Sequence, residues 1–178
     1  TGKELKTVAE IDASVSDLMT SARLYMYGLQ FTYNPHRMIL NRVTDVYLLD
    51  ADGNRRELED DKLYRVVADL YSGQMLSAVT KTSYGLLSVV PKKADGTPIE
   101  NFEDVILTDN GGELKAWTAI AHYMESFPDE NGDGIADIPQ YYAGLHERKV
   151  VDDSANLIKL IKNPNKYAVM IAGVVLIV

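Results

Sequence analysis

Residues 28–79 read Gly28-Leu-Gln-Phe-Thr-Tyr-Asn-Pro35, Leu40-Asn-Arg-Val-Thr-Asp-Val46, an Asp52-Gly53 pair and Leu63-Tyr-Arg-Val-Val-Ala-Asp69. Alternation up to Tyr33 and the β-branched content of residues 42–49 predict two strands. An Asp-Gly pair is typical of a tight hairpin turn, so residues 56–58 are expected to return beside the second strand. The valines of residues 64–68 predict a third long strand.

Outside this stretch the pattern changes from strands to helices. Thr1 and Glu4 have the spacing of a capping box and predict a helix over residues 4–10. Further helices are expected over residues 72–81 and 113–127, with a strand over residues 86–90 between them. The apolar face of the last helix consists of Leu114, Trp117, Ala121 and Met124. Strands that precede helices without βαβ alternation predict an α+β fold, in which a mixed sheet is packed with helices and the C-terminal part is helical.

Composition limits the class of protein. The chain has 178 residues, a net charge of -8 and no cysteine. This length suits one domain with an appendage. The acidic balance, without a Lys/Arg run, excludes nucleic acid as a partner, because phosphate backbones are bound by clustered cations. The lack of cysteine excludes disulfides, thiolate zinc sites and cysteine nucleophiles.

Four short motifs follow one another in an informative order. They are Thr1-Gly-Lys-Glu-Leu-Lys6, Gly28-Leu-Gln-Phe-Thr-Tyr33, Asn41-Arg-Val43 before a glycine-containing hairpin, and Leu63-Tyr-Arg-Val-Val67. In this order they resemble the C-terminal domain of the 5'-nucleotidase family, the bifunctional metallophosphatase/5'-nucleotidase-like proteins, over roughly residues 1–127. The resemblance implies a domain that holds a nucleoside or nucleotide. It also implies a partner, an N-terminal metallophosphoesterase domain outside this chain, whose two divalent metals break the phosphate ester.

The resemblance also identifies candidate substrate-binding residues. Nucleotide-binding members of the family continue from the last motif into a Gly-Gly-Asp-Gly-aromatic loop, which this chain replaces with Asp69-Leu-Tyr-Ser-Gly-Gln-Met75. Tyr71 lies near the position of the stacking ring, and Gln74 has the amide that a base edge requires. One stacked ring contributes about 1–3 kcal/mol. The alternative is that Tyr71 is a half-buried structural tyrosine.

Residues 129–140 form an acidic loop with the Asp-x-Asn-x-Asp-Gly pattern of calcium sites. Calcium prefers six to eight oxygen ligands, which alternating residues and one backbone carbonyl would supply. The candidate ligands are Asp129, Asn131, Asp133, Ile135 through its carbonyl, Asp137 and Gln140. Gln140 is no bidentate carboxylate and Pro139 blocks a following helix, so an ion-free turn is the alternative to a structural Ca²⁺ site.

No residue of this chain is predicted to be catalytic. His36, His122 and His146 lack metal-ligand spacing, and no nucleophile elbow, P-loop or dinucleotide-binding motif occurs. The adjacent pairs Asp60-Asp61 and Asp152-Asp153 are expected to be turn or cap residues. The chain alone is therefore not expected to hydrolyse phosphate esters.

The apolar residues 168–178 end the chain. A membrane helix needs roughly 20 apolar residues, so this run is interpreted either as the first half of a C-terminal anchor or as a buried terminal helix or strand. We expect three parts: a 5'-nucleotidase C-terminal-like domain over 1–127, an acidic loop with a helical extension over 128–166, and the apolar tail over 167–178.

Two functions remain open from the sequence. The first is a substrate-recognition domain of a larger hydrolase, extracellular and held at the cell surface or membrane of a bacterium by its tail. The second is a non-catalytic cell-surface interaction module that keeps the fold without the nucleotide pocket.

Overall fold

The computed structural model describes residues 1–178 except 17–19, 21–22, 51, 83–86 and 178. The long elements are α1 (Gly2–Val15), β1 (Leu29–Tyr33), β2 (Val43–Leu49), β3 (Arg55–Glu57), α2 (Leu70–Thr82), α3 (Ala116–Glu125), β6 (Lys149–Val151), α4 (Leu157–Ile161) and α5 (Lys166–Ile177). Shorter elements are η2 (Phe102–Val105), β4 (Thr108–Asp109), β5 (Gly112–Glu113) and η3 (Gln140–Ala143). Helices and strands are both present, as the α+β prediction requires.

A four-stranded sheet in the order β3-β2-β1-β6 forms the base of the fold. β1 pairs antiparallel with β2, and β2 pairs antiparallel with β3 across the Asp52-Gly53 turn. β6 joins the other edge of β1 in parallel, with Phe31 opposite Lys149. The strand over residues 42–49 and the returning strand after the hairpin are thereby confirmed to within one residue.

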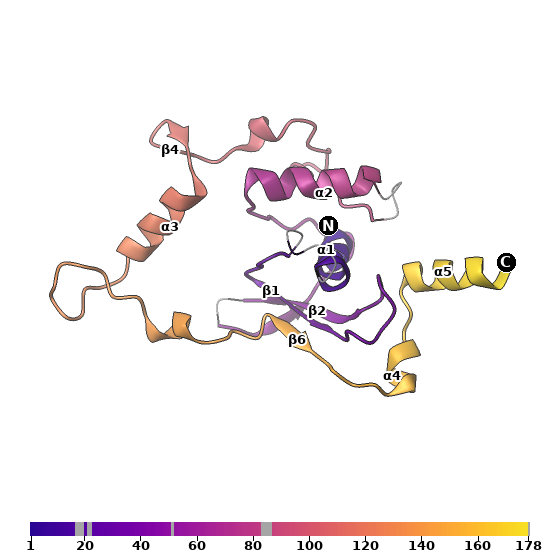
Figure 1. Cartoon of the computed structure of the whole chain (residues 1–178). Coiled ribbons are helices and arrows are strands. Elements are labelled where there is room, and N and C mark those ends of the chain that lie inside the picture. The colour runs from indigo at the N-terminus through magenta and orange to yellow at the C-terminus, as the bar shows by residue number, and fades with distance from the viewer. Residues whose placement is uncertain (17–19, 21–22, 51, 83–86, 178) are drawn as a thin grey trace.

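Helix α1 lies between this sheet and α2 (Figure 1). Ala9 and Ala13 pack on Phe31 of β1, since their small side chains let the helix approach the sheet. The other side of α1 contributes Val8 and Ile11 to a second cluster with Leu87, Val89 and Tyr167. Tyr167 comes from α5, so the N-terminal helix and the C-terminal helix share one core.

The start of α1 confirms the predicted capping box. The Thr1 hydroxyl accepts a hydrogen bond from the Glu4 amide, while the Glu4 carboxylate accepts bonds from the N-terminal residue. The helix runs further than residues 4–10 because its second half is buried. At Gly2 a Cβ atom would lie 2.3 Å from the Glu59 carbonyl oxygen, so the Thr-Gly-Lys motif needs glycine for a close backbone approach.

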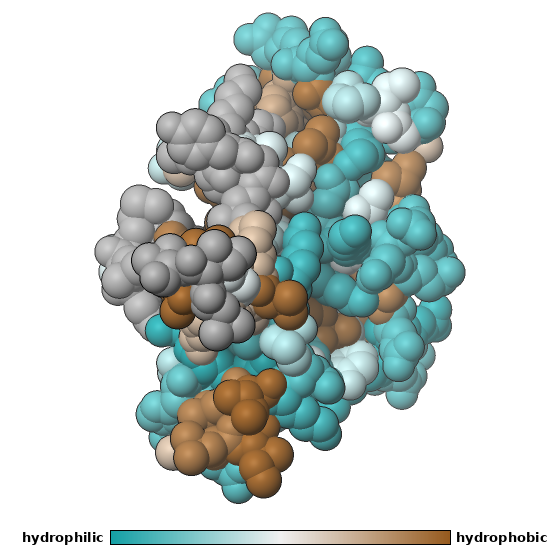
Figure 2. Space-filling model, turned by 90° about the vertical axis from the view of Figure 1, so that its right-hand side faces the viewer, coloured by the Kyte–Doolittle hydropathy of each residue, from teal (hydrophilic) through white to brown (hydrophobic). Residues whose placement is uncertain are grey.

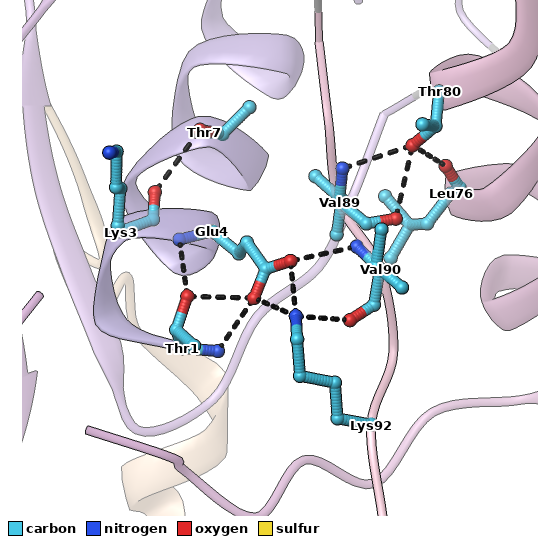
Figure 3. A network of polar contacts seen from close by, with 9 residues as sticks. All are labelled: Thr1, Lys3, Glu4, Thr7, Leu76, Thr80, Val89, Val90 and Lys92. Carbon is cyan, nitrogen blue, oxygen red and sulfur yellow. Dashed lines mark hydrogen bonds and ion pairs between the residues drawn. The ribbon is translucent and has the colours of Figure 1, made fainter. Parts of the chain in front are cut away.

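Glu4 also connects α1 to a distant segment (Figure 3). Its Oε1 accepts a hydrogen bond from the Val90 amide at 2.9 Å and from Lys92 Nζ at 2.6 Å. Burial alone would raise the pKa of Glu4, but the bonds from Lys92, Thr1 and Val90 outweigh it and lower the pKa to about 2. The ionised carboxylate therefore anchors residues 90–92 to the helix.

Two predicted strands are wrong. Residues 62–69 form no strand, and Val66 and Val67 are exposed. The sheet ends at β3 and β6, and the valine-rich segment pairs with neither of these edge strands. Residues 87–91 also form no strand; Leu86 lies outside the described residues. Val89 instead donates its amide to the Thr80 hydroxyl, and the same hydroxyl donates to the Val89 carbonyl.

Helix α2 confirms the predicted helix over residues 72–81, whereas α3 is shorter than expected. Glu113 pairs with Thr108 in the β4–β5 hairpin, so α3 begins only at Ala116. Figure 1 shows the segment from β4 to η3 extending away from the sheet. The apolar face of α3 is accordingly exposed, and Trp117 retains 71% of its accessible surface.

The C-terminal region returns to the body through β6, α4 and α5. In the described part of the chain, no helix combines the length and the apolar character needed to cross a bilayer. Tyr167 and Ala168 at the start of α5 are buried. Figure 2 shows apolar residues gathered on the face toward which α5 points. The exposed apolar residues of α4 and α5 are Leu157, Ile158, Ile161, Val169, Met170, Val174 and Val175.

Candidate functional site

The predicted substrate-binding pair lies on the first turn of α2. Asp69 caps this helix, since its carboxylate accepts hydrogen bonds from the Ser72 amide at 2.8 Å and the Ser72 hydroxyl at 2.7 Å. The Ser72 amide bond, with the hydroxyl bond, lowers the pKa of Asp69. Tyr71 is 61% exposed and Gln74 is exposed three residues later. Side chains three positions apart are neighbours on a helix surface, so one planar ligand can contact both Tyr71 and Gln74.

The structure places Tyr71 where a ligand can reach it. Its exposure excludes a core position, and the alternative of a half-buried structural tyrosine stays open. Gly73 beside it packs against the Phe102 ring of η2, where a Cβ would lie 3.0 Å from a ring carbon. This contact fixes the buried side of α2 and leaves the side of Tyr71 open.

The acidic loop of residues 129–140 is exposed and held together by its own carboxylates. Asp129 accepts hydrogen bonds from the amides of Gly132, Asp133 and Gly134. These bonds lower the pKa of Asp129, and the bond from the Gly134 amide has the largest effect. Asp137 accepts the amides of Glu130 and Asn131. The loop therefore keeps its first position, Asp129, ionised at neutral pH.

Two other predicted calcium ligands, Asn131 and Asp133, also use their side-chain oxygens to accept backbone amides. The Asp133 carboxylate accepts the Ile135 amide at 2.8 Å, and the Asn131 side chain accepts the Asp133 amide at 2.9 Å. Gln140 begins the η3 turn. Among the described residues, no group of three or more His, Asp or Glu side chains is arranged to hold a metal ion.

The histidines are separated in the structure. His36 Nε2 lies 2.8 Å from Asp153 Oδ1 near the end of β6. The His146 ring lies against Tyr141, with 4.2 Å between ring centroids, and His122 lies in the last turn of α3. Asp60, in the other acidic pair, binds Lys6 at the start of α1. The expectation that none of these residues is catalytic stays a prediction.

A cavity that the sequence did not indicate lies between the C-terminal half of α1, β1 and β6. Its volume is about 390 Å³. Its lining consists of Asp12, Ala13, Ser16, Arg23, Tyr25, Met26, Leu29, Phe31, Tyr33, Arg148 and Lys149. Neither Tyr71 nor Gln74 contributes to it. No local motif could reveal this cavity, because Arg148 and Lys149 reach it only through the parallel pairing of β6 with β1.

A buried ion pair forms one wall of the cavity. Asp12 is 2% exposed, and its Oδ2 lies 2.6 Å from Lys149 Nζ. Asp12 Oδ1 also accepts the Leu24 amide at 2.7 Å. The aspartate therefore connects α1, the segment before β1, and β6.

The mixed sheet and the helix packed on it define an α+β domain, and no two-metal centre is assembled among the described residues. Residues 1–79 match the family model described as 5'-nucleotidase, C-terminal domain. The match covers 79 of the 178 residues and supports the resemblance of this part of the chain to that family. Searches among curated proteins and among solved structures found no match.

The matched residues include α1, β1, β2, β3 and most of α2. The four motifs that suggested the family all lie within them. β6 and α5 come from outside the match, yet β6 extends the sheet and α5 contributes Tyr167 to the core. The division at residues 127 and 166 stays a prediction, and these contacts show that its parts pack together.

Proposed function

We propose that this chain is the nucleoside- or nucleotide-recognition part of a 5'-nucleotidase-like metallophosphoesterase, and that hydrolysis takes place on an N-terminal two-metal domain. The family match over residues 1–79 is the observation that carries the proposal. The exposed ring of Tyr71, with Gln74 beside it on α2, supports a role in holding a base. In this role the chain orients the substrate, while the metals of the other domain activate water.

Tyr71→Ala is expected to weaken the binding of adenosine about tenfold. A stacked ring is worth about 1–3 kcal/mol, and about 1.4 kcal/mol corresponds to one factor of ten. Gln74→Ala should weaken binding less, because a hydrogen bond exposed to water contributes about 1 kcal/mol. NMR shift titration of the intact chain with adenosine and with AMP gives both affinities.

Tyr141→Ala is the matched control, since Tyr141 is equally exposed but lies in η3. It should leave the titration unchanged. Adenosine binding that survives Tyr71→Ala, or that Tyr141→Ala reduces to the same extent, would remove α2 as the recognition surface. No binding of any nucleoside at millimolar concentration would favour the second candidate function.

That second candidate is a non-catalytic interaction module on a cell surface. The exposed apolar face of α3 favours it, because contiguous apolar surface in a soluble protein is typical of an interaction site. The exposed residues of this face are Trp117, Ile120 and Met124. A bacterial surface location, with residues 167–178 at the membrane, stays a prediction; the exposed valines of α5 support it.

We also propose that the loop of residues 129–140 binds a structural Ca²⁺. Its support is the position of Asp129, Asn131 and Asp133 on successive alternate residues, with Gly134 at φ +88° allowing the sharp turn. Binding would require Asp129 and Asp133 to turn some oxygen lone pairs from backbone amides toward the ion.

Addition of millimolar Ca²⁺ is expected to raise the melting temperature, because a ligand that binds only the native state stabilises it. Loops of this kind bind with dissociation constants of about 10⁻⁴–10⁻³ M, so a tenfold excess adds about 1.4 kcal/mol. Asp133→Asn should abolish the response, whereas Asp95→Asn, in another exposed turn, should keep it. An unchanged melting curve for the wild-type chain in 10 mM Ca²⁺, about ten times the weakest expected constant, would disprove the calcium site.

A further inference from the structure

We propose that the cavity between α1, β1 and β6 binds a small aromatic anion, with its acidic group at Arg23 and Arg148 and its aromatic body against the apolar part of the lining. This site is separate from Tyr71 and Gln74, and it goes beyond the proposed function of α2. The ligand class is an aromatic carboxylate or an aromatic phosphate monoester, which share a ring and an oxyanion.

The charges that line the cavity favour an anion. Four charged side chains face it: Asp12, Arg23, Arg148 and Lys149. Asp12 and Lys149 neutralise each other at 2.6 Å. Neither Arg23 nor Arg148 forms an ion pair within the part of the chain that the structure describes. Among the described lining residues, positive side chains therefore exceed negative ones by two, in a chain whose net charge is -8.

Aromatic rings position Arg148 and Lys149 without neutralising their charges. The guanidinium carbon of Arg148 lies 4.9 Å from the centre of the Tyr27 ring, and Lys149 Nζ lies 5.6 Å from the centre of the Tyr25 ring. A cation over a ring face is held electrostatically, yet its N–H groups remain able to donate. Arg148 is also fixed through its backbone, because its carbonyl accepts the Phe31 amide at 3.0 Å.

The remaining lining combines apolar side chains with Ser16 and two tyrosines, Tyr25 and Tyr33, and suits a ring. Ala13, Met26, Leu29 and Phe31 contribute to it, and Phe31 is almost completely buried beneath the cavity. A volume of about 390 Å³ falls within the range of roughly 300–1,000 Å³ that is typical of small-molecule sites. Apolar surface with a few convergent donors is the usual composition of such a site. An inorganic anion alone would leave this surface unused.

Titration of the intact chain with phenyl phosphate, benzoate, inorganic phosphate and benzyl alcohol tests the site. We expect phenyl phosphate or benzoate to shift the NMR signals of the Arg148 and Arg23 guanidinium groups, and inorganic phosphate and benzyl alcohol to bind at least about tenfold more weakly. A response to phenyl phosphate alone identifies a phosphate ester, and an equal response to benzoate identifies a carboxylate. Because the wild-type chain is observed, the result does not depend on how a variant folds.

Arg148→Gln and Arg23→Gln are each expected to weaken this binding about tenfold or more, because each removes a charge-assisted donor. Arg65→Gln is the matched control, since Arg65 is exposed and does not line the cavity. Tyr71→Ala should have no effect here, which keeps this test distinct from that of the α2 surface. The proposal is overturned if no aromatic anion binds at 10 mM, about the limit of a useful site, or if Arg65→Gln weakens binding as much as Arg148→Gln.

Discussion

Glu10→Leu is expected to lower the free energy of unfolding by about 3 kcal/mol, because it removes three hydrogen bonds inside the contact between α1 and the sheet. Glu10 is 3% exposed. Its carboxylate accepts the Ser14 hydroxyl at 2.6 Å, the Arg42 amide at 2.8 Å and the Val43 amide at 2.9 Å. Leucine offers these donors no acceptor. Urea or thermal unfolding followed by circular dichroism measures the loss.

These bonds explain why the loss should be large. Ser14, one turn later on α1, in turn accepts the Leu40 amide at 2.9 Å. Together Glu10 and Ser14 fix the backbone of residues 40–43, where β2 begins. Removing the carboxylate therefore affects both the helix and the first residues of the strand.

Two further variants test this explanation. Glu10→Gln keeps one acceptor but directs an N–H₂ group toward a backbone donor, so we expect an intermediate loss of about 1–2 kcal/mol. Glu57→Leu changes an exposed glutamate of β3 and should stay within about 0.5 kcal/mol of the wild type. A Glu10→Leu protein as stable as Glu57→Leu would contradict the role given to this carboxylate.

The effect of Glu10 should also depend on pH. Burial raises the pKa of Glu10 above its ordinary value of 4.5, although the bonds from Ser14, Val43 and Arg42 act against it. The native state then binds this proton more tightly than the unfolded chain does. The resulting stabilisation is complete below the unfolded pKa and is lost as pH rises through the folded pKa. The stability difference between wild type and Glu10→Leu should therefore be larger near pH 4 than near pH 7.

Local chemistry made several elements predictable from the sequence. The capping box of Thr1 and Glu4 depends on residues three positions apart, and the Asp52-Gly53 hairpin depends on one turn. The strand over residues 42–49 and the helix over residues 72–81 have their own periodicity. Three of the four family motifs overlap α1, β1 and β2, and the fourth, residues 63–67, forms no strand; all four lie within the matched residues 1–79.

Non-local pairing explains what the sequence did not reveal. β6 lies opposite β1 although Lys149 and Phe31 are far apart in the chain, and three residues are too few for a recognisable pattern. The valines of residues 64–68 pair with neither edge strand of the sheet, β3 or β6. The cavity with Arg148 could not be predicted because it depends on the same non-local pairing of β6 with β1, whereas Tyr71 and Gln74 could be proposed because they follow a motif directly.

A polar anchor holds this non-local part in place, and its removal gives the second large prediction. Arg37→Met is expected to detach residues 152–168 from the body while the rest of the fold remains. Arg37 is buried, and its guanidinium donates to the carbonyls of Asn41 at 2.6 Å, Lys159 at 2.8 Å and Lys162 at 3.0 Å. The last two are carbonyls at the end of α4, which have no partner within a helix.

Hydrogen exchange is the direct measurement of this detachment. The amide of Asn165, which donates to the Asn41 side chain at 2.9 Å, should exchange about a hundredfold faster in Arg37→Met, equivalent to about 3 kcal/mol of local stability. The amides of β2 should keep most of their protection, since β1 and β3 still flank that strand. Methionine retains an unbranched apolar side chain, so the loss reflects the missing donors rather than lost volume.

Two controls separate the anchor from a general effect of arginine. Arg65→Met should leave exchange unchanged, because Arg65 is exposed. Arg37→Lys keeps the charge but cannot reach several carbonyls with one ammonium group, so exchange should increase by about tenfold. Unchanged exchange at Asn165 in Arg37→Met would mean that Tyr167, buried against Val8 and Ile11, holds the C-terminal region without the arginine. Faster exchange there and in β2 alike would mean that the region is an integral part of the domain rather than a segment attached to it.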